Sequence, residues 1–214
     1  MKFYHIQRLP LPINIAKWNK GQIIETNKLL PYNAYFEGIL SSLKNGSKMK
    51  EPNGESTMAY GYKYFKQNDY RNTKNTKKFG LIGYQLAMQY QKWIREELFE
   101  RVRLSDFPQL PSRKNSIWVT NKELVPNWNQ QILRGQLTEE TRIFEVSLDQ
   151  DSNIHNADQY YVEIEAFSIE DIEERAQDYW KGNLSKNPMI EVIVEGKLTV
   201  NNIFKDINEW KKSI

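Results

Sequence analysis

The distribution of apolar and polar residues along the chain predicts a mixture of strands and helices. Alternating or short apolar runs, which are typical of strands, occur in six places. These are residues 3–8, 21–26 (a short strand or turn), 116–120, 142–148, 160–167 and 190–194. They are not separated by helices in the regular period of βαβ units, and no internal repeat is present. We therefore expect an α+β fold.

Two segments have helical periodicity instead. From about residue 81 to 104, apolar residues return every three or four positions, and most charged residues fall on the other face. A second helix is expected to begin with a capping box, because Ser168 is followed three residues later by Asp171. It should run to about Trp180 and stop at Gly182. Residues 45–57 have the composition of a polar loop.

Length and composition limit the class of protein. A chain of 214 residues that is 39% hydrophobic and 27% charged is expected to be one soluble domain, residues 1–214, with an inserted lobe at about 40–105. No apolar run approaches the roughly 18 residues that a membrane span needs, and the N-terminus lacks the apolar core of a signal peptide. These absences predict a cytoplasmic protein that does not bind membranes. The chain has no cysteine and only two histidines, so we expect neither disulfides nor a metal site.

Charge is divided unevenly along the chain. Residues 1–135 contain 22 Lys and Arg against 10 Asp and Glu, or +12, and residues 136–214 contain 8 against 17, or −9, which gives the net +3. Such a division favours an anionic partner for the first part, either nucleic acid or the diphosphate of a dinucleotide. Two oppositely charged surfaces of one domain would give the same numbers without a partner.

A stretch at residues 60–78 combines aromatic and basic side chains, with Asp69 as its only acidic residue. Its members are Tyr60, Tyr62, Lys63, Tyr64, Phe65, Lys66, Tyr70, Arg71, Lys74, Lys77 and Lys78. Aromatic rings beside basic groups can bind single-stranded nucleic acid, where each stacked base contributes roughly 1–3 kcal/mol. The same composition suits a surface for an acidic protein, or an extended loop whose rings pack inward.

Two ionisable residues interrupt otherwise apolar strands near the two ends of the chain. His5 lies within Phe3-Tyr4-His5-Ile6, and Glu191 opens the apolar run at 191–196. Each has an ordinary structural explanation, as a satisfied core histidine or a strand-edge glutamate in solvent. Their joint presence suggests a site. The other histidine, His155, lies in the polar stretch 153–158 and is expected at the surface.

Several segments carry a resemblance to known families. The aromatic–histidine pair at 3–5, followed by Gly-Gln-Ile-Ile at 21–24, resembles the opening of ADP-ribosyltransferase-fold proteins. Segments within 99–120 and 176–196 are similar to a bacterial family, DUF2441, thought to share that fold. The glutamate segment at 191–196 also resembles that of bacterial DNA-modifying ADP-ribosyltransferases. The resemblance implies a split β-sheet core with flanking helices, and NAD as a substrate.

The resemblance also implies roles for individual residues. Cleavage of the nicotinamide–ribose bond gives the ribose oxocarbenium character, which a fixed carboxylate stabilises electrostatically, and Glu191 is the catalytic candidate. His5 would hold the adenosine ribose, and Tyr4 or a neighbouring aromatic ring would stack on the base. Arg113 would pair with the diphosphate. Ser116 opens the next strand, where the family places a small hydroxyl residue in the NAD groove.

Alternatives remain at these positions. Arg113 could instead be solvated, and Ser116 could cap a strand. Arginine-modifying toxins of this fold carry a second glutamate two residues before the catalytic one, but here Met189 stands there, so arginine is a doubtful acceptor. Glu163 and Glu165 form a rival pair, which strand alternation would place on a polar face.

The expected function is transfer of ADP-ribose from NAD to a macromolecular acceptor in a bacterium or phage, with nucleic acid favoured by residues 60–78. Two alternatives are a non-catalytic module on the same fold that binds nucleic acid or protein, and an ADP-ribosyltransferase acting on a small molecule such as an antibiotic.

Overall fold

The computed structural model of the chain falls into two compact units. Unit 1 comprises Met1–Asn33 and Leu98–Ile214, and unit 2 comprises Ala34–Glu97, which overlaps the lobe expected at about 40–105. The structure describes residues 2–9, 18–26, 34–45, 47–50, 56–59, 76–133, 140–163 and 168–214.

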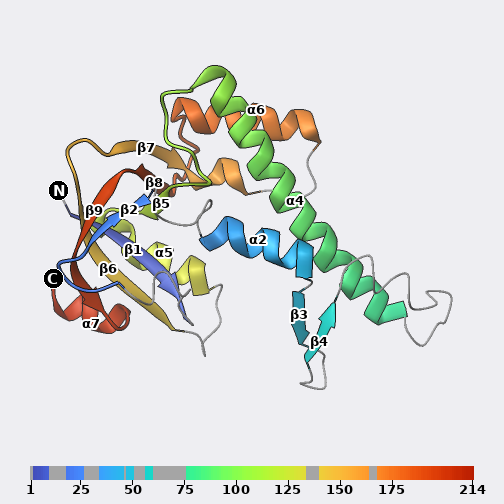
Figure 1. Ribbon diagram of the computed structural model, residues 1–214, viewed down its shortest axis with the longest axis horizontal. Coiled ribbons are helices and arrows are strands. Elements are labelled where there is room, and N and C mark those ends of the chain that lie inside the picture. The colour runs from blue at the N-terminus through green and yellow to red at the C-terminus, as the bar shows by residue number, and fades with distance from the viewer. Residues whose placement is uncertain are drawn as a thin grey trace. The chain divides into compact units, whose positions relative to one another are not determined.

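Unit 1 contains two antiparallel sheets, shown in Figure 1. The first sheet has the order β1 (Lys2–Arg8), β6 (Thr141–Leu148), β9 (Lys197–Phe204) and β2 (Ile23–Glu25). The second sheet has the order β5 (Ile117–Val119), β8 (Ile190–Glu195) and β7 (Asn153–Asp158). Mixed helices and antiparallel sheets confirm the α+β class.

Among the described residues, an isolated backbone bridge joins the two sheets of unit 1. The N–H of Tyr4 donates to the carbonyl of Thr120 at 2.8 Å, and the N–H of Thr120 donates to the carbonyl of Tyr4 at 2.9 Å. Because β5 also pairs with β8, strands β1, β5 and β8 follow one another in space. Three segments far apart in the sequence are thus neighbours.

The two sheets pack face to face over an apolar core, which we call the inter-sheet layer. The alternation of each strand explains it, since every second residue of β5 and β8 points toward the first sheet. Its buried members are Phe3, Trp18, Ile24, Ile117, Val119, Phe144, Val146, Val192, Val194, Leu198 and Val200.

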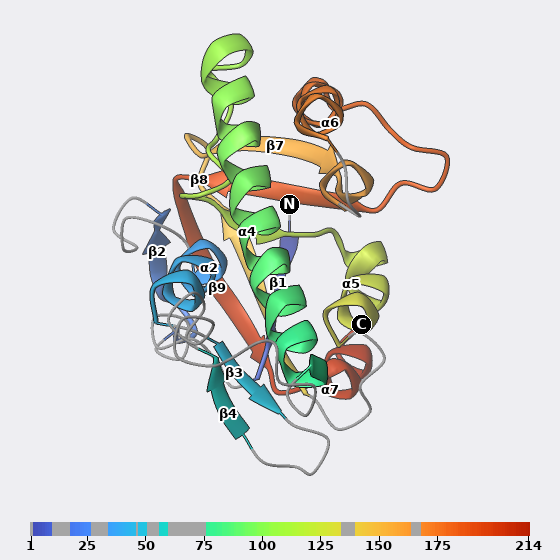
Figure 2. The same cartoon turned by 90° about the vertical axis from the view of Figure 1, so that its right-hand side faces the viewer.

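Helices cover the outer face of each sheet. Helices α5 (Val125–Leu133) and α7 (Ile207–Lys212) contribute Val125 and Trp210 to the core on the first sheet. The C-terminal part of α4 (Thr76–Asp106) and helix α6 (Ile169–Lys181) cover the second sheet, and α6 lies over β7 and β8 in Figures 1 and 2. We call this second core the helix-covered layer. Its buried members are Leu98, Phe99, Val102, Ala157, Val162, Ile172, Ala176, Tyr179, Trp180 and Ile193.

Gly196 turns the chain from the second sheet into the first. It separates β8 from β9 and has φ of 139°, a backbone angle that side chains rarely adopt. A Cβ atom here would also lie 2.8 Å from the Cα of Ser152. Glycine is therefore required at this corner for two independent reasons.

Helix α6 forms as the sequence predicted. The Ser168 side chain accepts from the N–H of Asp171 at 3.1 Å, and the Asp171 carboxylate accepts from the N–H of Ser168 at 3.0 Å. This reciprocal pair is the expected capping box. At the other end, Gly182 has a left-handed φ of 73° and closes the helix.

Two local predictions were wrong, and one strand was not predicted. The strand expected at 160–167 begins instead as the 3₁₀ helix η4 (Gln159–Val162), because the Asp158 side chain accepts from the N–H of Tyr160 and starts a turn. Residues 164–167 lie outside the described part. The polar stretch 153–158, for which no element was predicted, forms strand β7. The loop expected at 45–57 contains strands β3 (Ser47–Lys50) and β4 (Ser56–Ala59).

Unit 2 contains helix α2 (Ala34–Asn45), the β3–β4 pair and the first part of α4. The helix predicted at 81–104 is confirmed and extends to Thr76 and Asp106. Arg95 on α4 donates from Nη2 to the hydroxyl of Tyr35 on α2 at 2.6 Å, which ties the two helices within this unit.

Candidate functional site

Glu191 is buried in the helix-covered layer, although it is ionisable. It is the second residue of β8, and its side chain is on the same face as that of Ile193, beneath α6. Only 7% of the residue is exposed. A charged group in such a place needs partners, and the structure supplies two.

The two partners of Glu191 are Arg113 and Tyr179. Nη1 of Arg113 forms an ion pair with Oε1 of Glu191. The hydroxyl of Tyr179, on α6, donates to the same oxygen at 2.6 Å and accepts from Nη1 of Arg113 at 2.5 Å. Three residues from a loop, a helix and a strand therefore form a closed triangle of hydrogen bonds, which we call the Glu191 cluster.

Aromatic rings enclose the Arg113 guanidinium. Its central carbon lies 4.9 Å from the ring centre of Tyr179, 5.4 Å from that of Trp118 and 5.7 Å from that of Phe99. These distances are typical of cation–π contacts, which are stronger when desolvated, and Arg113 is 5% exposed. Hydrogen bonds from Nη1 and the three surrounding rings together fix the position of the guanidinium.

Burial sets the protonation of Tyr179. It raises the pKa of Tyr179 well above 10, and the neighbouring Glu191 charge raises it further while Arg113 opposes the change. The hydroxyl consequently keeps its proton at physiological pH. It acts as a donor to the carboxylate.

The loop that carries Arg113 is held by α4 and β8. Nη1 of Arg103 donates to the carbonyl of Leu110 at 2.8 Å, and Ser112 Oγ donates to Oε2 of Glu100 at 2.9 Å. The N–H of Ser112 donates to Oε2 of Glu195 at 3.1 Å. The position of Arg113 is thus fixed by contacts on both sides of the loop.

A second buried carboxylate fixes the chain just before Glu191. Asp158, at the end of β7, is fully buried. Its Oδ1 accepts from the N–H groups of Tyr160 at 3.1 Å and Met189 at 3.0 Å, and its Oδ2 accepts from that of Ser185 at 2.8 Å. Three backbone donors hold the entry into β8 in one conformation.

His155 is not at the surface as the sequence suggested. It lies on β7, half-buried, with its ring 5.8 Å from that of Tyr179 and 5.4 Å from that of Trp180. Its Nε2 donates to the carbonyl of Tyr179 at 3.0 Å. Burial lowers the pKa of His155, and the nearby Glu191 charge raises it by less. The error arose because polar neighbours concealed a strand whose alternate residues turn inward.

His5 and Tyr4 lie on opposite faces of β1. Tyr4 packs edge-on against Trp210 in the layer beneath α5 and α7. His5 faces the inter-sheet layer, with ring centres of Trp18 and Phe144 at 5.3 Å and 6.0 Å. The aromatic surface beside His5 is therefore formed by these neighbours, and Tyr4 faces away from it.

The protonation of His5 follows from its contacts. Its Nδ1 is 2.8 Å from the carbonyl oxygen of Trp118, which only accepts, so Nδ1 carries the proton. Burial lowers the pKa of His5 more than this hydrogen bond raises it, and the ring is neutral. The Gln7 side chain also raises the pKa of His5, by less than burial lowers it. Nε2 is a buried acceptor with no partner in hydrogen-bonding geometry among the described residues.

The structure brings together some of the predicted residues and separates others. Arg113 contacts Glu191, and Ser116, fully buried, follows Arg113 in the same loop. His5 lies in the inter-sheet layer and reaches the Glu191 cluster only through β5, because the Trp118 carbonyl meets His5 while the Trp118 ring meets Arg113.

Sequence reasoning gave Tyr179 no role. One signal was available, since Ile172, Ala176 and Tyr179 share the apolar face of α6. A tyrosine on such a face needs a hydrogen-bond partner for its hydroxyl.

The rival glutamate pair is placed less favourably for catalysis. Glu163 is exposed after η4 and accepts a long, 3.4 Å hydrogen bond from Gln131. Glu165 lies outside the described residues. So do residues 60–75 of the aromatic and basic stretch, while 76–78 begin helix α4.

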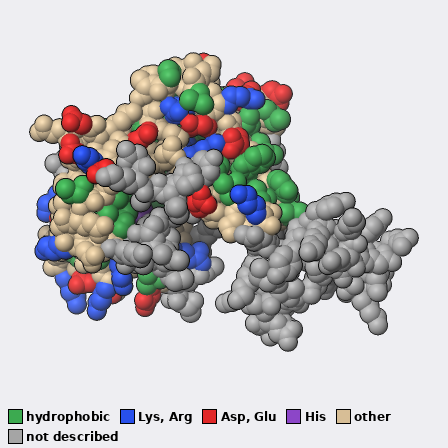
Figure 3. Space-filling view, in the orientation of Figure 1, with side chains coloured by type: hydrophobic (Ala, Val, Ile, Leu, Met, Phe, Trp, Pro, Cys, Tyr) green, Lys and Arg blue, Asp and Glu red, His purple; other side chains and the backbone are tan. Residues whose placement is uncertain are grey.

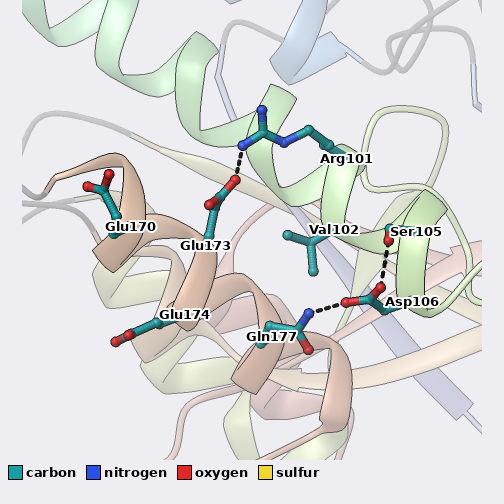
Figure 4. A pocket seen from close by; sticks show the side chains of 8 residues that line it. All are labelled: Arg101, Val102, Ser105, Asp106, Glu170, Glu173, Glu174 and Gln177. Carbon is teal, nitrogen blue, oxygen red and sulfur yellow. Dashed lines mark hydrogen bonds and ion pairs between the residues drawn. The ribbon is translucent and has the colours of Figure 1, made fainter.

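A groove of about 530 Å³ lies elsewhere, between α4 and α6 (Figure 4). Two contacts cross it, an ion pair between Arg101 and Glu173 and a hydrogen bond from Gln177 to Asp106. Its lining includes none of the five predicted NAD residues. We interpret this groove as the seam between two packed helices.

Charge on the described surface is mixed. Acidic and basic side chains are interspersed on the face shown in Figure 3. Within the described ranges, no group of three or more acidic or histidine side chains could hold a metal ion. None of the helices in that same part of the chain has the length and apolarity needed to cross a membrane.

Comparison with known families decides one of the resemblances. The sequence model described as "Protein of unknown function (DUF2441)" matches residues 3–209. The chain belongs to the DUF2441 family. The match includes all the residues of the Glu191 cluster, together with His5 and Ser116. No curated protein matches the chain.

Proposed function

We propose that this DUF2441 protein is an NAD-dependent ADP-ribosyltransferase acting on a macromolecular acceptor. The observation that carries the proposal is the order β1–β5–β8. The three segments that resemble the ADP-ribosyltransferase fold, namely the histidine strand, the strand opened by Ser116 and the glutamate strand, are neighbours in this order. A chance set of short motifs would have no reason to meet.

The chemistry needs a carboxylate near the reacting ribose. In the proposed reaction the bond from the ribose carbon to the nicotinamide nitrogen breaks, and its electron pair leaves with nicotinamide. A nucleophilic atom of the acceptor then bonds to that carbon and releases its proton. A fixed anion stabilises the positive charge that develops on the ribose. Glu191 is a fixed anion, held by two donors.

The buried Nε2 of His5 fits the other end of NAD. A neutral acceptor nitrogen without a described partner is suited to a hydrogen bond from an adenosine ribose hydroxyl. The adenosine and nicotinamide riboses are separated by the diphosphate, so His5 and Glu191 need not touch each other. The proposal requires that both become accessible when NAD binds.

A second function is favoured by the burial of the cluster. Glu191, Arg113 and Tyr179 are each at most 7% exposed, as in a buried ion pair that serves only the fold. In that case the protein is a non-catalytic module that binds nucleic acid or protein, with residues 60–78 as the candidate surface. Its nucleic-acid affinity would fall with salt and would not depend on Glu191.

Transfer of label from adenine-labelled NAD distinguishes the two functions. Wild type, Glu191→Gln and the matched control Glu163→Gln are incubated with cell lysate, then with purified DNA, RNA and protein. We expect Glu191→Gln to lose at least about 100-fold in transfer, the range for removal of one electrostatic stabiliser, and Glu163→Gln to keep the wild-type rate. Circular dichroism confirms that each variant is folded at the assay temperature.

Each outcome has one meaning. Transfer by wild type and Glu163→Gln but not by Glu191→Gln supports the enzyme and identifies the acceptor fraction. Equal transfer by all three proteins contradicts the assignment of Glu191. Wild type that neither binds nor cleaves NAD contradicts the enzyme and leaves the binding module.

A further inference from the structure

The two carboxylate oxygens of Glu191 differ in their contacts. Oε1 receives both donors, from Arg113 and from Tyr179. Oε2 makes no hydrogen bond to any residue that the structure describes. A carboxylate has about four lone-pair sites, so half of its capacity is unused.

Asp158 shows what a structural carboxylate looks like in the same sheet. Its Oδ1 accepts two backbone N–H groups and its Oδ2 accepts one. Buried polar groups are normally satisfied in this way. Glu191 differs from Asp158 in that both of its donors, a cation and a hydroxyl, reach the same oxygen.

We propose that Arg113 and Tyr179 are positioning residues that clamp Oε1 of Glu191 and so present Oε2 to the nicotinamide ribose. The proposal rests on the proposed function. It changes the role of Arg113, which the sequence had assigned to the diphosphate of NAD. Nη1 of Arg113 is directed to Glu191 and Tyr179, and three aromatic rings surround its guanidinium.

The two clamp residues contribute different things. The Arg113 charge compensates the buried carboxylate, whose burial alone would be costly. The Tyr179 hydroxyl fixes the rotation of the carboxyl group, because it reaches Oε1 from α6 while Arg113 reaches it from the loop. Positional errors of about 1 Å can cost 100-fold in rate, so a fixed rotation matters for a group that must meet one hydroxyl.

The test is nicotinamide release from NAD by Tyr179→Phe, which removes one hydroxyl and keeps the ring. Its matched control is Tyr160→Phe, since Tyr160 is 47% exposed on η4. We expect Tyr179→Phe to lower kcat roughly 10- to 100-fold and to leave KM for NAD within about two-fold of wild type, because the clamp acts on the transition state. Tyr160→Phe should match wild type in both.

A second variant series separates positioning from simple structural damage. If Tyr179 acts through Glu191, then adding Tyr179→Phe to Glu191→Gln should lower the residual rate no further. Damage to the fold would lower the rate equally in both backgrounds. Arg113→Lys keeps the charge but changes the fork of donors, and it should also lower kcat. Arg101→Lys, at an exposed ion pair on α4, is its control.

The outcomes separate the clamp from the enzyme. Wild type that releases nicotinamide, with Tyr179→Phe as fast as wild type, overturns the clamp and leaves the proposed function standing. An equal loss with and without Glu191 also overturns it. Wild type that releases no nicotinamide overturns the proposed function and, with it, the catalytic role of the clamp.

Discussion

The two faces of the second sheet are built from the same strands but have opposite chemistry. Toward the first sheet, Val192 and Val194 of β8 enter an apolar layer. Toward the helices, Glu191 of the same strand meets Arg113 and Tyr179. Apart from His5, the inter-sheet layer is apolar, whereas the helix-covered layer contains a buried ion pair. Replacement of such a pair by hydrophobic residues of similar volume is often neutral for stability. This contrast distinguishes the Glu191 cluster as the ionic part of the helix-covered layer.

The largest effect on stability should come from breaking the ion pair. Arg113→Met leaves the Glu191 charge buried without a counter-ion, and we expect it to lower the free energy of unfolding by about 3–5 kcal/mol. The double variant Arg113→Met with Glu191→Gln should recover most of this loss, because no charge remains. Urea unfolding of the three proteins measures both effects.

The stability of the double variant decides between two explanations of the loss in Arg113→Met. If the double variant is no more stable than Arg113→Met, the loss comes from packing of the arginine side chain against its three rings. The helix-covered layer would then resemble the inter-sheet layer in its energetics.

A smaller loss is expected at the structural carboxylate. Asp158→Asn replaces by an amide donor either the oxygen that accepts from Ser185 or the one that accepts from both Tyr160 and Met189. We expect a loss of roughly 1.5–3 kcal/mol, the range for hydrogen bonds to a charged group. Unfolding by urea at neutral pH gives the value.

The pH dependence of this loss can be stated with its sign. Burial alone would raise the pKa of Asp158, but the hydrogen bonds from Ser185, Tyr160 and Met189 outweigh it and lower the pKa below its ordinary value of 3.8. The stabilisation is therefore present above pH 3.8 and is lost as the pH falls through the lowered value. The difference between wild type and Asp158→Asn should be constant near neutrality and shrink in acid. A constant difference down to pH 2 would contradict this explanation.

The smallest effect is expected at His5, in the apolar layer. Because burial lowers its pKa below 6.5, the unfolded chain binds a proton as the pH falls past 6.5 while the folded chain does not, and stability decreases. His5→Phe should remove this contribution and change the free energy of unfolding at pH 7.5 by no more than about 1 kcal/mol.

The measurement is urea unfolding at pH 7.5 and at pH 5.5. Wild type should lose more stability between the two values than His5→Phe, and some loss should remain in the variant because the pKa of His155 is lowered as well. Equal losses in the two proteins would show that His5 does not titrate as its burial implies.

The sequence predicted correctly those elements whose position is determined by residues close together in the chain. The capping box at Ser168 and the glycine at 182 determine the ends of α6 through contacts within a few residues. Alternation located β1 and β6, and short apolar runs located β5 and β8, for the same reason. These features depend on neighbours in the chain.

Other elements lacked such signals. Strand β7 reads as polar because one face is exposed at an edge of the second sheet, and only Ala157 and Asp158 are buried. Helices α2, α5 and α7 were not predicted, and α7 has only six residues. The prediction of a strand at 160–167 was wrong because a hydrogen bond from the Tyr160 N–H to the Asp158 side chain starts a turn there, despite the alternation.

The sequence predicted several residues of the candidate site, but not which of them contact one another. Glu191, Arg113 and Ser116 were named from the sequence, and the first two prove to be partners. Their contact joins residues 78 positions apart, which no single sequence specifies. The separation of His5 from Tyr4 could have been inferred, because successive residues of a strand point to opposite faces.

The central claim is that the Glu191 carboxylate acts on NAD and is not only a partner for Arg113. The most direct measurement is the rate of nicotinamide release from NAD by wild type and by the double variant Arg113→Met with Glu191→Gln, which we expect to stay folded without a buried charge. We predict release by wild type and a loss of at least about 100-fold in the folded double variant. Release at the wild-type rate by the double variant, or no release by wild type, would contradict the claim.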